Sequence, residues 1–185
     1  ILSVCLPLRV SAYNDSGTVI GETSPLSFSD SLIGGVSAEV SGGTHMAEKN
    51  ASAVFSMPAE VALLVSALIV VEEFDEAGLD QTFTVNMTEF PYITDVGNLQ
   101  IPNWAKVTYR DLLSLMLLCR SQDAAAILAV AIGDRYSSYL ERMNYKASVL
   151  NMSGTYFTSV NGVASPEQTT SFADIISLLE AVAAN

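Results

Sequence analysis

The stretch SMPAEVALLVSALIVVE, residues Ser56–Glu72, decides the fold. Within its helical part only Glu60 and Ser66 are polar, so a helix here is apolar on every face. Such a helix is typical of a protein interior, and this one is shorter than the ~20 residues that cross a bilayer. We therefore predict a central buried helix that begins at Pro58, with Ser56 as its N-cap.

The composition indicates a globular chain of about one domain. Of its 185 residues, 50% are hydrophobic and 15% are charged, which is ample for a packed core and unlike a disordered segment. Lys and Arg together number 8 against 20 for Asp and Glu, a net charge of −12. Nucleic acids and anionic membranes bind basic surfaces. We therefore expect neither as a partner, and no transmembrane segment.

The N-terminal residues resemble a processed leader. Residues 1–12 form an apolar run that ends in Val10-Ser11-Ala12, as a secretory signal ends before its cleavage site. A first β-strand is the alternative, and Arg9 within the run favours it. Residues 13–35 are rich in Ser, Gly, Thr and Asn, which is typical of a linker or a ragged N-terminus. We expect an extracytoplasmic protein whose folded part is residues 36–185, with Cys119 as its one remaining cysteine.

The remaining elements follow from periodicity and from capping signals. Residues 35–49 predict a β-hairpin turning at 41–44, residues 81–85 a short strand, and residues 86–106 an irregular segment. Further helices are predicted over 107–118, 121–131, 135–150 and 171–184, and a loop with a short strand over 151–162. The helix at 107–118 opens with Thr108 and Asp111 at the spacing of a capping box.

The sequence offers few groups for metal or triad chemistry. His45 is the sole histidine, and it follows a predicted hairpin turn, where an exposed residue without a special role is the simplest interpretation. No His/Cys spacing typical of a metal site occurs, and a Ser-His-Asp triad would have to use His45. We expect no metal and no cofactor.

Several fragments in one order resemble a known family. Glu48-Lys-Asn-Ala51 is followed by Pro58-Ala-Glu-Val-Ala-Leu63, then by Thr108-Tyr-Arg-Asp-Leu-Leu113 and Ser121-Gln-Asp-Ala-Ala125. Further on come MNYKASVLNMSGTYF at 143–157 and TSFAD at 170–174. They are similar to Glu-Lys-Asn-Ala, Pro-Ala-Ser-x-x-Lys, Thr-x-x-Asp-Leu-Leu, Ser-Gly-Asn-Asp-Ala-Ala, Met-Asn-x-Lys-Ala-x-x-Leu-Gly-Met-x-x-Thr-x-Phe and Ser-Thr-Ala-x-Asp. These are motifs of the serine D-alanyl-D-alanine carboxypeptidases, the low-molecular-mass penicillin-binding proteins.

This resemblance implies a fold. The family is α/β (α+β), a transpeptidase or β-lactamase-like architecture in which helices flank an antiparallel sheet and a helical subdomain is inserted. Residues 36–185 would then be a partial domain of this kind. The late strands that carry the family's Lys-Thr-Gly motif have no counterpart before Asn185.

The resemblance also assigns four site positions, and three of them are substituted. The nucleophilic serine of Ser-x-x-Lys falls on Glu60 and the lysine base on Leu63, and no Ser-x-x-Lys occurs anywhere in the chain. The Ser-x-Asn motif matches Ser121 and Asp123, so an amide donor has become a carboxylate. Local roles are the alternative: Glu60 as a first-turn acid favoured by the helix dipole, and the pair Ser121 and Asp123 as an N-cap and a first-turn acid.

The function expected on this basis is that of a secreted family member that lacks catalysis. Catalysis is not expected because Glu60 and Leu63 cannot form a nucleophile–base pair. The protein would instead bind peptidoglycan stem peptides or a cell-wall partner protein. The alternative is an active serine D,D-peptidase of cell-wall remodelling with its nucleophile elsewhere, for which Ser121 is the candidate. If the family cleft is kept, Glu60 and Asp123 are expected to project into it and to repel each other unless a cation neutralises them.

Overall fold

The computed structural model describes residues 35–39, 44–86, 101–133, 135–163 and 165–185, with side chains from Lys49 onward. The expected leader at 1–12, nearly all of the expected linker at 13–35, the hairpin turn and most of the segment 86–106 lie outside these ranges. The side chain of His45 also lies outside them.

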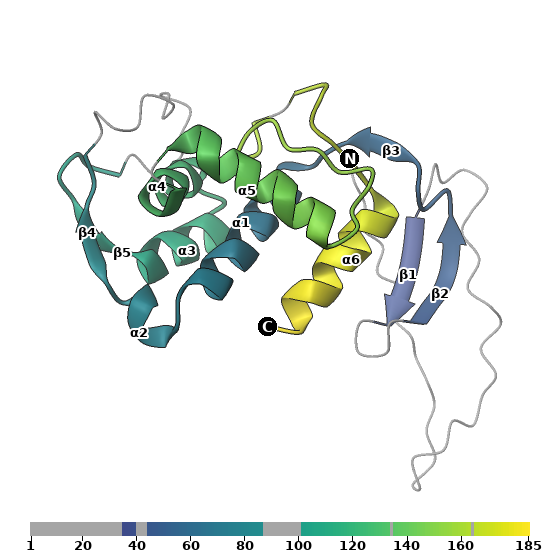
Figure 1. Ribbon diagram of the computed structural model, residues 1–185, viewed down its shortest axis with the longest axis horizontal. Coiled ribbons are helices and arrows are strands. Elements are labelled where there is room, and N and C mark those ends of the chain that lie inside the picture. Colours follow the sequence, from purple (N-terminus) through teal and green to yellow (C-terminus); the bar gives the residue numbers. More distant parts are fainter. Residues whose placement is uncertain (1–34, 40–43, 87–100, 134, 164) are drawn as a thin grey trace, which may run out of the picture.

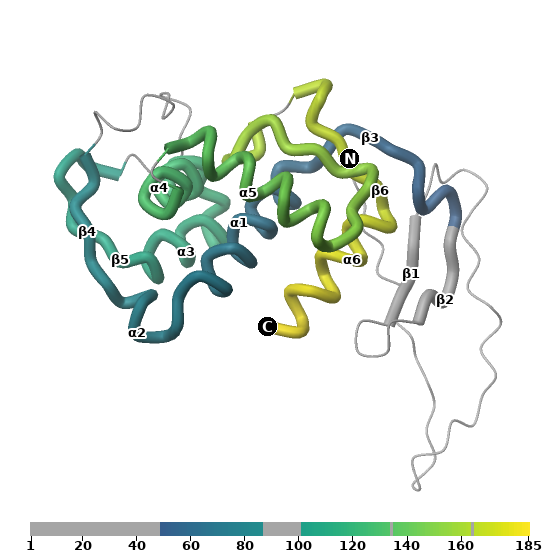
Figure 2. Tube along the Cα trace, in the orientation of Figure 1, coloured from purple at the N-terminus to yellow at the C-terminus, as the bar shows by residue number. Residues whose placement is uncertain are grey.

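The predicted central helix is confirmed as α1, Ala59–Glu73. It runs through the middle of the molecule and contacts α3, α4, α5 and α6 (Figures 1 and 2). Its N-cap is Pro58, with extended backbone angles and no side-chain cap, whereas Ser56 lies in strand β3, Val54–Ser56. The predicted Ser56 cap is therefore wrong, because two residues separate that side chain from the first helical residue.

The helices around α1 also follow the predicted pattern. α3 spans Tyr109–Leu118, α4 Gln122–Gly133, α5 Tyr136–Val149 and α6 Phe172–Ala183. The capping box at α3 is confirmed: the Asp111 N–H donates to Thr108 Oγ1 at 2.9 Å, and the Thr108 N–H donates to Asp111 Oδ2 at 3.0 Å. These hydrogen bonds stabilise the ionised carboxylate and lower the pKa of Asp111. A short helix α2, Glu76–Leu79, was not predicted.

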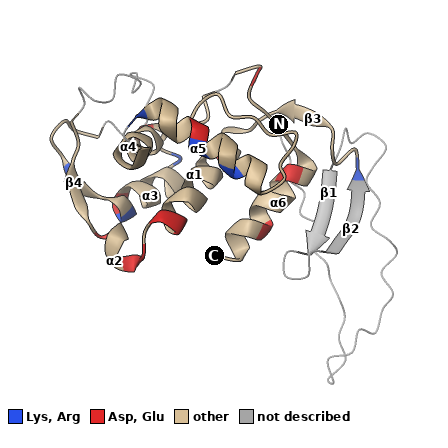
Figure 3. Ribbon diagram, viewed as in Figure 1, with Lys and Arg blue, Asp and Glu red and all other residues tan. Residues whose placement is uncertain are grey.

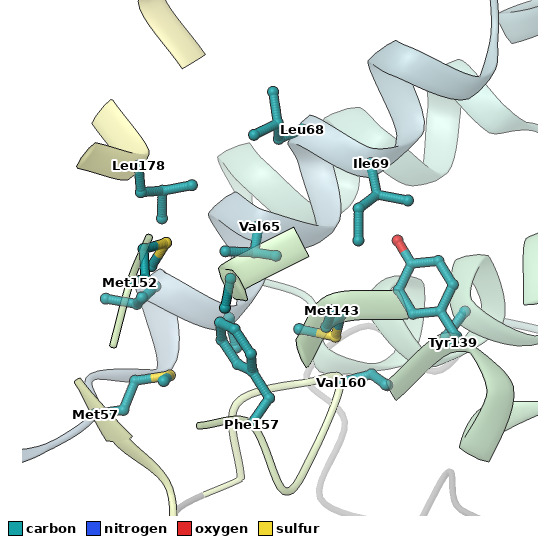
Figure 4. Close-up of a cluster of buried hydrophobic side chains, with 14 residues drawn as sticks. Met57, Val65, Leu68, Ile69, Tyr139, Met143, Met152, Phe157, Val160 and Leu178 are labelled. Carbon is teal, nitrogen blue, oxygen red and sulfur yellow. The ribbon is translucent and has the colours of Figure 1, made fainter. Parts of the chain in front are cut away.

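Two hydrophobic clusters cover opposite sides of α1. The first joins α1 to α5, α6 and the loop after α5, and Figure 4 shows its larger side chains, among them Val65, Leu68, Tyr139 and Phe157. The second joins α1 to α3 and α4 and includes Leu63, Leu112, Met116, Leu128 and others. Burial on both sides explains why α1 carries no polar face.

The strands form three antiparallel pairs. β1, Gly35–Glu39, pairs with β2, Thr44–Lys49, as the sequence predicts. β4, Thr82–Thr84, pairs with β5, Lys106–Thr108, and β3 pairs with β6, Thr169–Ser171. Helices and small antiparallel sheets together make the α+β class expected from the resemblance. None of the described helices is both long enough and apolar enough to cross a membrane.

Candidate functional site

The start of α1 carries the first position of interest. Glu60 is the only acid in the first turn of α1, and its side chain is 53% exposed. The adjoining cap residue, Pro58, offers no side-chain acceptor to the first N–H groups of the helix. A carboxylate in this first turn is stabilised by the positive end of the helix dipole.

Glu60 is paired with a cation that the sequence did not single out. The Nη1 atom of Arg120 lies 3.0 Å from Glu60 Oε1, and the Arg120 side chain is 72% exposed. Arg120 follows Cys119, the C-cap of α3, and has a positive φ of 52°. The charge of Glu60 is thus compensated by Arg120, and a compensating cation is the condition under which no repulsion with Asp123 was expected.

Leu63 lies one turn further along α1 and points into the second hydrophobic cluster. It is buried and shares that cluster with Leu112, Met116 and Leu128. An apolar side chain neither accepts nor donates a proton. The Leu63 position therefore contributes packing and no general base.

Ser121 and Asp123 serve the start of α4. Ser121 is fully buried, and its Oγ accepts a hydrogen bond from the Ala124 N–H at 3.2 Å, as an N-cap does. Asp123 is 5% exposed and lies in the first turn of α4. Within the described part of the chain it has no ion-pair or hydrogen-bond partner. These are the local roles left open as the alternative.

A buried polar loop packs against the beginning of α1. Gly162 has a φ of 74°, and a Cβ at this position would lie 2.7 Å from the Ala59 Cα, so both its backbone and its surroundings require glycine. Next to it, Asn161 is buried and its Oδ1 has no hydrogen-bond partner among the described protein atoms. Gln168 Oε1 accepts from the N–H groups of Thr158 and Ser159, at 3.2 and 3.0 Å. The loop thus packs against Ala59 at the start of α1.

Arg120 was missed because the sequence was matched to the family motif at Ser121. One signal was available: Arg120 stands between the end of one predicted helix and the N-cap of the next, where a left-handed residue is common. Acids gather around the C-terminal end of α1 and α2 (Figure 3). No group of three His, Cys, Asp or Glu side chains that could hold a metal occurs among the described residues.

Comparison with known proteins yields a family match and several similar structures. The D-alanyl-D-alanine carboxypeptidase model, peptidase family S11, matches residues 36–185. The D-alanyl-D-alanine carboxypeptidase DacD from Francisella tularensis has a TM-score of 0.76 at 21% identity, over 93% of this chain and 42% of its own. Penicillin-binding protein 6B from Escherichia coli has a TM-score of 0.74 at 22% identity, over 89% and 54%.

A third similar structure is the D-alanyl-D-alanine carboxypeptidase from Mycobacterium tuberculosis, with a TM-score of 0.69 at 23% identity, over 82% of this chain and 56% of its own. The chain thus spans about half the length of these structures, and likeness at such identities shows the fold alone. No curated protein sequence matches the chain. Because the family model covers most of the chain, from residue 36 to residue 185, the protein belongs to the D-alanyl-D-alanine carboxypeptidase family.

Proposed function

We propose that this protein is an extracytoplasmic member of the family that binds peptidoglycan stem peptides without cleaving them. The observation that carries the proposal is the pair of residues at the family's nucleophile and base positions. Glu60 is held in an ion pair with Arg120, and Leu63 is buried among apolar side chains. Acyl transfer by the family mechanism needs a hydroxyl and an amine at these two positions.

The surroundings of Ser121 argue against an active serine peptidase with a displaced nucleophile. Ser121, the candidate for that role, is fully buried, and its Oγ is engaged at the start of α4. A nucleophile must be reachable by the substrate and must lie beside a base. Ser121 fails the first requirement because it is fully buried, and its Oγ is already engaged by the Ala124 N–H.

The structure supports a different register for the second family motif. The family's Ser-Gly-Asn-Asp-Ala-Ala aligns without a gap when its Asp-Ala-Ala is placed on Asp123-Ala124-Ala125. The motif serine then falls on Arg120 and the asparagine on Gln122. This register agrees with the contact between Arg120 and Glu60 and with the burial of Ser121 and Asp123. We propose it in place of the register on Ser121 and Asp123.

Family membership supports the proposal of peptidoglycan binding and of an extracytoplasmic location. The family acts on the D-alanyl-D-alanine ends of stem peptides, and a member without catalysis can still present a peptide-binding surface. A cell-wall partner protein is the other occupant consistent with this proposal.

Two assays on the purified full chain test the proposal. We expect no covalent adduct with a fluorescent penicillin by intact mass, and no D-alanine release from a peptide ending in D-Ala-D-Ala, under conditions in which an active family enzyme gives both. We also expect retention of the protein on isolated peptidoglycan sacculi, with competition by the same peptide. A stoichiometric penicillin adduct would overturn the lack of catalysis, and absence of retention would overturn peptide binding.

A matched set of variants sharpens the first assay. Neither Glu60→Ser nor Leu63→Lys alone is expected to allow penicillin labelling, because a nucleophile and its base act as a unit. Labelling by either single variant would show that another group already supplies the missing function.

A further inference from the structure

Arg120 occupies a backbone position where arginine is unusual. Its φ of 52° lies in the left-handed region, which glycine adopts freely and other residues adopt at a cost. The residue after it is fixed on both sides: the Ser121 N–H donates to the Leu115 carbonyl at 3.2 Å, and Ser121 Oγ caps α4. A strained residue held by its surroundings is a recurrent feature of functional sites.

The guanidinium of Arg120 is largely uncommitted. Its contact with Glu60 is an ion pair without an aligned hydrogen bond, and the side chain is mostly exposed. Arg110 provides the contrast, because its Nε donates to Asp80 at 2.6 Å and its Nη2 donates to Glu76 at 2.6 Å. A guanidinium carries five N–H donors in a planar fork that matches a carboxylate. Arg120 therefore has donors to offer and a geometry suited to a carboxylate ligand.

We infer that Arg120 is a carboxylate-binding residue at the start of α1 and that Glu60 is the internal carboxylate which a ligand displaces. This inference rests on the proposed function and names the part of the peptide that the site holds, its C-terminal carboxylate. The uncapped start of α1 adds positive potential on the side facing Glu60. Leu118, two residues before Arg120 in the chain, is 84% exposed and adds apolar surface to this end of α3.

The net negative charge of the protein opposes the binding of a carboxylate. At a net charge of −12 the chain repels anions at long range, so a carboxylate needs a local cation that is not already neutralised by hydrogen-bonded acids. Arg142 and Arg110 are hydrogen-bonded to acids. Arg120 is the cation that is both loosely paired and placed beside the family's site positions.

The experiment is calorimetric titration of the full chain with an N-acetylated peptide ending in D-Ala-D-Ala and with the C-terminal amide of the same peptide. We expect the peptide acid to bind, and the peptide amide to bind at least about tenfold more weakly, because a charged hydrogen-bonded pair is lost. Arg120→Gln should weaken binding of the acid by a similar factor and leave binding of the amide unchanged. Arg135→Gln is the matched control, an exposed arginine at the N-cap of α5 whose loss changes the net charge equally.

Glu60→Gln tests the displacement. Removal of the competing carboxylate should tighten binding of the acid about two- to fivefold, the range for an exposed ion pair. Weaker binding by Glu60→Gln would overturn the role of Glu60 as a competitor. Equal binding of acid and amide, or equal effects of Arg120→Gln and Arg135→Gln, would overturn the role of Arg120 while leaving peptide binding intact.

A second measurement separates the anion site from the proposed function. In ¹⁵N NMR spectra of the arginine side chains, sodium acetate should shift the Nε–H signal of Arg120 more than sodium chloride of equal ionic strength does, with no such difference at Arg135. A specific acetate shift without binding of the peptide would retain the carboxylate site and reject the stem peptide as its ligand. No acetate-specific shift at Arg120 would reject the carboxylate site.

Discussion

The two ends of α1 carry acids in opposite relation to the helix dipole. At the N-terminal end Glu60 lies where the dipole favours an acid, and its partner Arg120 is mostly exposed. At the C-terminal end Glu72 and Glu73 lie where the dipole disfavours acids. There Lys146 of α5 pairs with Glu72, and Arg142 Nη2 donates to Glu73 Oε2 at 2.7 Å.

The ion pairs at the C-terminal end of α1 are structural, whereas the fold does not need the ion pair at the N-terminal end. The C-terminal acids require cations, and the cations come from α5, so these pairs join two helices of the core. Lys146 is only 19% exposed, which strengthens its interaction relative to a fully solvated pair. Glu60 is stabilised by its own helix, so Arg120 is free of a structural duty. This freedom is what makes the N-terminal end a candidate binding site.

The largest expected effect comes from placing a charge beneath the N-terminal end. Leu63→Lys would bury an ammonium group in the second hydrophobic cluster, and we expect the free energy of unfolding to fall by about 3–5 kcal/mol, the cost of an uncompensated buried charge. Chemical denaturation at neutral pH measures the change. Leu64→Lys is the control, because Leu64 is partly buried and its substitution should cost clearly less. Equal losses for the two variants would show that Leu63 is not the more deeply packed of the pair.

The sequence predicts local features of this fold better than remote ones. The buried α1 and the capping box of Thr108 and Asp111 follow from neighbouring residues, and both are confirmed. The strands β3, β5 and β6 were missed, whereas the equally short β4 was predicted from the alternation of residues 81–85. The pairing of Val54 with Ser171 also joins distant segments.

The same limit applies to the candidate site. Glu60 and Leu63 lie on one helix, so their register follows from the sequence and from the helical repeat. Arg120 depends on the backbone between α3 and α4, where one left-handed residue decides which side chains face α1. A shift of one residue there exchanges the exposed Arg120 for the buried Ser121. No local pattern in the sequence fixes that turn.

The next largest effect concerns Tyr139, which packs α5 against the middle of α1. Its hydroxyl donates to the Ser66 carbonyl at 3.2 Å, and burial raises the pKa of Tyr139 to about 12 (Figure 4). The folded state therefore retains a proton that the unfolded chain releases near pH 10. Stability from this residue is present below pH 10 and is lost as the pH rises to about 12, by about 3 kcal/mol in total.

Comparison with Tyr139→Phe isolates this contribution. The variant lacks the ionisable hydroxyl, so its free energy of unfolding should fall less steeply than that of the wild type between pH 10 and pH 12. Urea denaturation at intervals of half a pH unit measures both curves. Parallel curves would mean that Tyr139 ionises as readily in the folded protein as in the unfolded chain.

A smaller loss is expected at the C-terminal end of α1. Lys146→Met keeps the length of the side chain but leaves Glu72 unpaired in the last turn of the helix, where the dipole disfavours it. We expect a loss of about 1 kcal/mol in the free energy of unfolding at pH 7 and low salt. The double variant Lys146→Met/Glu72→Gln should recover most of it, since the unpaired charge is then gone. Failure to recover would assign the loss to packing of the lysine stem.

The smallest expected effect is at the N-terminal end, and it decides whether the two ends differ as described. Arg120→Gln removes an exposed partner from an acid that the helix dipole already favours, so we expect the free energy of unfolding to change by less than about 0.5 kcal/mol. Glu60→Gln loses both the ion pair and the favourable dipole interaction, and its loss should lie between about 0.3 and 1 kcal/mol at low salt. Thermal denaturation at 20 and 500 mM sodium chloride measures both variants, and the loss in Glu60→Gln should shrink at the higher salt. If Arg120→Gln destabilises the protein as much as Lys146→Met does, Arg120 is a structural residue and the two ends of α1 are held in the same way.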